Sequence, residues 1–128
     1  MINVAASTKH QMSFSDVLNM AKIGKRDVAA ILLKEEFGKL QSPEQRVNLC
    51  KWIAACFEGL GDYGSAAEWY EMSGMLSLGE TSSDVANAIR ALPEYEKARA
   101  FYTMAEDEEK VELCSSVITQ LKKCFVAS

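Results

Sequence analysis

The side chains best suited to chemistry in this sequence are four cysteines and one histidine, and their spacing favours no reactive centre. Cys50, Cys56, Cys114 and Cys124 form no CxxC pair, and His10 lies far from all of them along the chain. A zinc site would need nearly every thiol to converge, because zinc takes four ligands. In a chain without a secretory signal, such cysteines are more simply read as reduced, half-buried apolar side chains. We therefore expect no metal, no cofactor and a cytoplasmic location.

Sequence motifs for catalysis are also missing. Catalysis needs a nucleophile with a base in reach, a set of metal ligands or a loop that cradles phosphate. The chain contains no GxxxxGK[ST], HExxH or GxSxG motif. A Cys–Glu pair or paired carboxylates assembled across helices remains the enzymatic alternative. We expect a protein that is not an enzyme.

The composition is that of one globular domain. The 128 residues are 48% hydrophobic and 25% charged, and only two are proline, which does not favour disorder. No apolar run approaches the roughly 20 residues that span a bilayer. Residues 1–12 have one lysine and no apolar segment of the kind found in signal peptides, so we expect a flexible leader there.

The charge balance argues against nucleic acid as a partner. The formal net charge is −4, whereas proteins that bind nucleic acid normally present a basic face. The local group Lys22, Lys25 and Arg26 is more simply explained by solvation at a helix junction. We expect neither nucleic acid nor a membrane to be the partner.

The hydrophobic pattern follows the helical period throughout, which predicts an all-α fold. Ser42 and Pro43 form a helix start, with serine as the cap and proline at the first helical position. A helix should end near Leu92, because a residue before proline is pushed out of helical geometry. The helix before it should face inward through Val85, Ala86 and Ile89. We expect seven helices, over residues 13–23, 25–37, 43–58, 63–76 and 82–91, from Pro93 to about 106, and over 107–125.

Two segments of the chain repeat each other at an offset of 32 residues. The aligned pairs are Tyr63 with Tyr95, Ala66 with Ala98, Trp69 with Phe101, Tyr70 with Tyr102, and Met72 with Met104. A fixed period in this range is typical of stacked repeats. Small alanines allow helices to approach closely, and buried tyrosines need a partner for the hydroxyl group.

From Val47 to Leu121 the chain resembles the tetratricopeptide (TPR) repeat family. In the first unit the matching positions are Cys50, Ile53, Ala54, Phe57, Gly61, Tyr63, Ala66, Tyr70 and Ser73. In the second they are Ser82, Val85, Ala86, Ile89, Pro93, Tyr95, Ala98, Tyr102 and Ala105. The spacing is 32 residues rather than the family's usual 34, and Leu78 and Lys110 replace the closing proline.

The resemblance implies stacked antiparallel helical hairpins in a right-handed superhelix. Within a single domain of residues 13–128, it places an N-terminal hairpin at 13–40, repeats at 43–78 and 82–106, and a capping helix at 107–125. It also implies a concave surface lined by the first helix of each hairpin. The partner-binding residues expected there are Asn48, Lys51, Asn87, Arg90, Thr119 and Lys122. Asparagine can bond a peptide backbone and the cations can meet carboxylates, although a solvated helix face also carries such residues.

Two functions follow from this interpretation. The one we prefer is an adaptor or chaperone-like module that holds a segment of a partner protein in the concave surface. The alternative is a structural homo-oligomer, because a short solenoid leaves apolar surface at an uncapped end. Its candidate face carries Ile31, Leu33 and Phe37 in the first hairpin.

Overall fold

The structure, a computed structural model, describes residues 26–79 and 85–127. This part of the chain contains only α-helices, which confirms the all-α class: α3 (Arg26–Lys39), α4 (Pro43–Leu60), α5 (Tyr63–Gly79), α6 (Val85–Met104) and α7 (Glu108–Ala127). The expected leader at 1–12 and the expected helix at 13–23 lie outside the described residues.

Local signals set the ends of these helices. Ser42 caps α4, since its hydroxyl accepts a hydrogen bond from the backbone N–H three residues later, and Pro43 opens the helix as expected. Gly61 ends α4 in the left-handed region, with φ 81°. The carboxylates of Asp62 and Asp107 accept hydrogen bonds from backbone N–H groups in the first turns of α5 and α7. These caps keep the connections short and turn neighbouring helices antiparallel.

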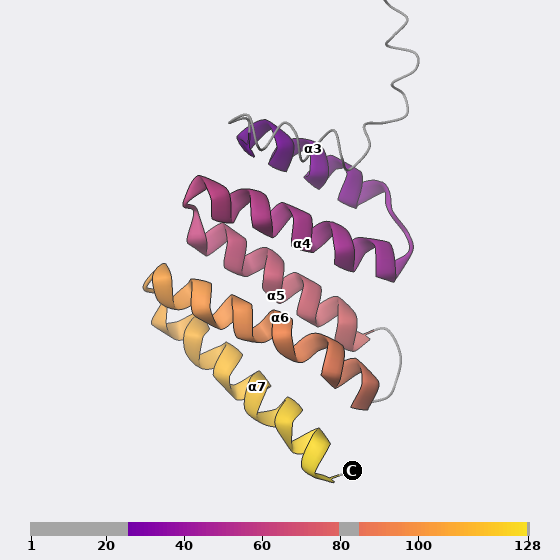
Figure 1. Cartoon of the computed structure of the whole chain (residues 1–128), viewed down its shortest axis with the longest axis vertical. Coiled ribbons are helices and arrows are strands. Elements are labelled where there is room, and N and C mark those ends of the chain that lie inside the picture. Colours follow the sequence, from indigo (N-terminus) through magenta and orange to yellow (C-terminus); the bar gives the residue numbers. More distant parts are fainter. Residues whose placement is uncertain (1–25, 80–84, 128) are drawn as a thin grey trace, which may run out of the picture.

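The five helices lie side by side in the order in which they occur in the chain. Figure 1 shows this progression from α3, in indigo, to α7, in yellow. The main packing is between consecutive helices, α3 with α4, α4 with α5, α5 with α6 and α6 with α7. The buried residues form one cluster between α3 and α4 and a larger one across α4, α5, α6 and α7. Trp69 of α5 packs against both clusters and connects them.

Aromatic side chains fill the interface between α5 and α6. The ring of Phe101 stacks with Tyr63 at 5.8 Å and with Tyr70 at 5.7 Å between centroids. The hydroxyl of Tyr102 donates a 2.6 Å hydrogen bond to Glu71, and that of Tyr70 donates one of 3.3 Å to Glu58. Two of the three buried tyrosines, Tyr70 and Tyr102, therefore have the hydroxyl partner that was expected.

The predicted helix boundary at Leu92 is wrong, because α6 continues through Pro93 to Met104. A proline inside a helix removes one backbone hydrogen bond, at a cost of about 3 kcal/mol. Ala91 before it and Tyr95 after it are both buried in the same cluster, so a break would separate side chains that now pack together. Seven helices were expected; with two merged into α6 and one outside the described residues, five remain.

The predicted inward face of this segment is also wrong. Val85, Ala86 and Ile89 are exposed, whereas Ala88 and Ala91 are buried. Helix α6 packs against α5 on one side and α7 on the other. Close approach on both sides favours the alanine face over the larger branched side chains, since small residues let helix backbones come together.

Candidate functional site

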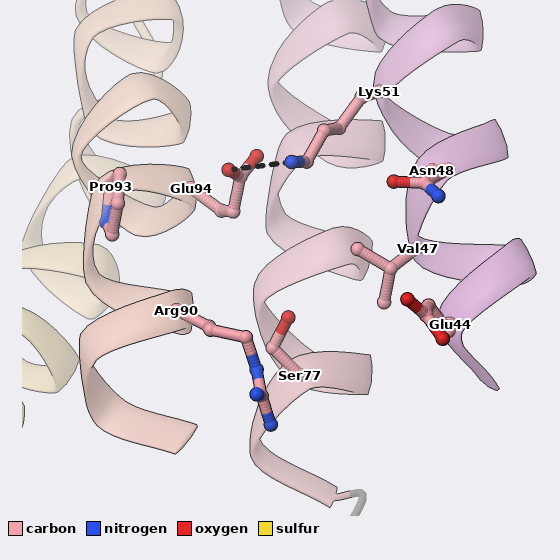
Figure 2. A pocket seen from close by; sticks show the side chains of 8 residues that line it. All are labelled: Glu44, Val47, Asn48, Lys51, Ser77, Arg90, Pro93 and Glu94. Atoms are coloured by element: carbon pink, nitrogen blue, oxygen red, sulfur yellow. Dashed lines mark ion pairs between the residues drawn. The ribbon is translucent and has the colours of Figure 1, made fainter. Parts of the chain in front are cut away.

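A cavity of about 450 Å³ opens between α4, α5 and α6 (Figure 2). Helix α4 contributes Glu44, Val47, Asn48 and Lys51, α5 contributes Ser77, and α6 contributes Arg90, Pro93 and Glu94. Its lining combines two carboxylates, two cations and an amide. Pockets that bind ligands commonly have volumes of about 300–1,000 Å³.

Helical periodicity brings the α4 residues together. Val47 and Asn48 lie three and four positions after Glu44, and Lys51 lies four and three positions after them, so all four occupy one face of the helix. The cap at Ser42 fixes where that helix begins. The same spacing applies on α6 to Arg90, Pro93 and Glu94, but only because the helix is continuous through the proline.

Glu94 is the buried charge of this cavity. Its side chain is only 7% exposed, and its Oε2 atom lies 3.6 Å from Lys51 Nζ, an ion pair that joins α6 to α4 across α5 (Figure 2). Its other oxygen, Oε1, is buried and receives no hydrogen bond from the described residues. A buried acceptor without a donor costs about 1–3 kcal/mol. A ligand that donates a hydrogen bond to Oε1 would recover this free energy.

The side chain of Arg90 is oriented by a hydrogen bond to a buried amide one helical turn earlier in α6. Its Nη2 donates a 2.8 Å hydrogen bond to Asn87 Oδ1, and Asn87 is only 3% exposed. The arginine itself is exposed at the edge of the cavity. Asn87 therefore orients a lining residue and does not line the cavity itself.

The thiol near this cavity is poorly suited to nucleophilic chemistry. The pKa of Cys50 is raised to about 12, mainly by burial; the positive charge of Arg46 lowers it and the negative charge of Glu94 raises it by smaller amounts. A thiol with a raised pKa stays protonated at neutral pH, and the thiolate is the nucleophile. All four cysteines of the chain lie in the described part, and none of them is joined to another in a disulfide.

The structure brings together three of the six predicted partner-binding residues. Asn48, Lys51 and Arg90 line the cavity. Thr119 and Lys122 are exposed on α7 and are not part of the lining. Whether any of the six binds a partner stays a prediction.

Sequence reasoning missed Glu94, together with Glu44, Val47, Ser77 and Pro93. Glu94 lies four residues after Arg90, a spacing that places both on one helical face. That signal was hidden by the assumption that Pro93 starts a new helix.

Comparisons of the chain with protein families, with curated proteins and with solved structures find no match. Across residues 26–79 and 85–127, no helix has the length and apolar character to cross a membrane. Within the same residues, no three or more histidine, cysteine, aspartate or glutamate side chains are grouped to hold a metal ion.

Proposed function

We propose that this protein is a non-enzymatic interaction module, of the adaptor or chaperone-like kind, that holds a segment of a partner protein in the cavity between α4, α5 and α6. The observation that carries this proposal is the lining itself. Two helices present polar and charged side chains across a third, and one buried carboxylate oxygen has no donor among the described residues.

The packing order supports a TPR-like arrangement with a different division into hairpins from the one expected. The second hairpin would consist of α6 and α7, instead of two helices within residues 82–106. Helices α4 and α6 contribute most of the lining, as the first helices of two hairpins would, and α5 and α7 follow as the second helices. With this division the 32-residue sequence repeat does not coincide with the structural unit. Tyr63 opens α5, whereas Tyr95 lies in the middle of α6.

The test is to block the cavity without changing its charge. Peptides selected from a random display library against the wild-type protein would be titrated by calorimetry into the wild type and Asn48→Trp. Asn48 is an exposed residue of the lining, so a tryptophan there fills the cavity mouth. We expect the affinity to fall about tenfold or more, which corresponds to about 1.4 kcal/mol.

The matched control is Gln45→Trp, an equally bulky change at an exposed position of α4 outside the lining. It should leave the affinity unchanged. Peptides that bind Asn48→Trp as tightly as the wild type would contradict the cavity as the binding site.

Self-assembly is the second candidate, and the observation that favours it is Ile31, which is 57% exposed on α3. The apolar face is smaller than expected, because Leu33 is buried in the core and Phe37 is half-buried. Selection that yields no peptide, combined with an oligomer in sedimentation velocity that Ile31→Glu dissociates, would replace the first proposal with this one.

A further inference from the structure

We propose that the partner segment presents a basic side chain, arginine or lysine, to Glu94 inside the cavity. This inference rests on the proposed function and specifies the chemistry that the site recognises. A basic side chain supplies the hydrogen-bond donors that Glu94 Oε1 lacks in the described part of the chain.

The ion pair between Lys51 and Glu94 is weak enough for an incoming cation to replace Lys51. Lys51 Nζ lies 3.6 Å from Oε2, beyond ordinary hydrogen-bond distance, and the lysine side chain is 43% exposed. Figure 2 shows this loose ion pair reaching across the cavity from α4 to α6. Because Oε1 is buried, a guanidinium or ammonium group that enters the cavity reaches the Glu94 carboxylate by displacing Lys51, so Lys51 competes with the ligand for this carboxylate.

In the opposite interpretation, an acidic partner segment forms ion pairs with Lys51 and Arg90. Both of these cations already have partners: Lys51 pairs with Glu94, and Arg90 donates to Asn87. In contrast, Glu94 Oε1 has no donor among the described residues, and Glu44 adds a second, exposed carboxylate to the lining. The net charge of −4 for the whole chain also attracts basic segments. These observations favour a basic ligand.

The two interpretations predict opposite effects of the same substitutions. For a basic ligand, Lys51 is a competitor, so Lys51→Met strengthens binding and Glu94→Gln weakens it. For an acidic ligand, Lys51 is an attractive group and Glu94 repels, so Lys51→Met weakens binding and Glu94→Gln strengthens it. Each substitution keeps a side chain of similar size.

The experiment is an NMR titration of backbone amides with small probes. N-acetyl-arginine amide is compared with N-acetyl-citrulline amide, which has nearly the same shape but no charge, and with N-acetyl-aspartate amide. In the wild type we expect arginine to shift the amides around Lys51 and Glu94 and to bind at least fivefold more tightly than citrulline. Glu94→Gln should abolish this preference, and Lys51→Met should increase the affinity for arginine at least twofold.

Equal binding of arginine and citrulline, or tighter binding of aspartate that Lys51→Met weakens, would overturn the inference. Lys51→Met retains Glu94 and so decides the question even if Glu94→Gln does not fold. The selected peptides separate this failure from failure of the proposed function. Peptides that Asn48→Trp excludes but that contain no basic residue would leave the cavity as a binding site and refute the basic ligand.

Discussion

At the scale of single residues, Gly74 shows how closely α5 and α6 approach. A Cβ atom added there would lie 2.7 Å from Cε2 of Tyr95, which is only 4% exposed and belongs to the larger core cluster. We expect Gly74→Ala to lower the free energy of unfolding by about 1–3 kcal/mol, as overpacking of a core does. Urea denaturation followed by circular dichroism measures it.

Gly38→Ala is the matched control for this substitution. Gly38 is also helical, in α3, and an added Cβ would meet no described atom within 4 Å. Alanine should raise the free energy of unfolding there by about 0.5–1 kcal/mol, because glycine loses more conformational freedom on folding. A Gly74→Ala protein as stable as the wild type would show that the α5–α6 interface is looser than described.

At the scale of elements, the continuity of α6 decides which side chains share the cavity. Pro93 is exposed, and the residue four positions before it, Ile89, is exposed as well. The backbone carbonyl that loses its N–H donor therefore lies on the accessible side of the helix, where water can hydrogen-bond it. This is the side on which a proline is least costly within a helix.

We expect Pro93→Ala to raise the free energy of unfolding by about 2 kcal/mol. Proline inside a helix costs about 3 kcal/mol relative to alanine, and a more flexible unfolded chain offsets up to about 1 kcal/mol of that gain. Pro43→Ala is the control, because Pro43 stands at the first position of α4, where proline is favourable. Equal responses of the two variants in urea denaturation would mean that α6 breaks at Pro93 after all.

The sequence predicted those elements whose signals are local. Ser42 and Pro43 mark the start of α4 by themselves, and the face that carries Asn48 and Lys51 follows from helical periodicity. The inward face of α6 was not predictable in this way, since it depends on packing against both α5 and α7. Glu94 was missed for the same reason: a local proline rule indicated a break that tertiary packing overrides.

At the scale of the whole molecule, several ionisable groups are buried in their neutral form. Burial raises the pKa of Tyr70 and of Tyr95 to about 12, and that of Cys114 from 9.0 to about 11. For Tyr102, burial and then its hydrogen bond to Glu71 raise the pKa above the ordinary value of 10.0. The folded protein therefore keeps protons that the unfolded chain releases in alkaline solution.

The free energy of unfolding should consequently fall as the pH rises above about 9. Below the pKa values of the unfolded chain, the folded and unfolded states both hold these protons. The buried groups then make their full contribution to the free energy of unfolding. Above the pKa values of the unfolded chain only the folded state holds these protons. The contribution to stability is therefore lost progressively as the pH approaches the pKa values of the folded protein. Urea denaturation between pH 8 and pH 11 measures the slope, and Tyr70→Phe should make it shallower. A stability that does not change over this range would contradict the burial of these groups.

The two tryptophans of the chain lie on one side of this arrangement. Trp52 packs against the α3–α4 cluster, and Trp69 packs where that cluster meets the larger one. Neither α6 nor α7 contains a tryptophan. Intrinsic fluorescence therefore reports on the N-terminal half of the stack, while the far-ultraviolet signal sums over all the helices. If the two halves of the stack unfold in different steps, the unfolding curves from fluorescence and from far-ultraviolet circular dichroism will not coincide. The fluorescence curve will then report the unfolding of α3, α4 and α5.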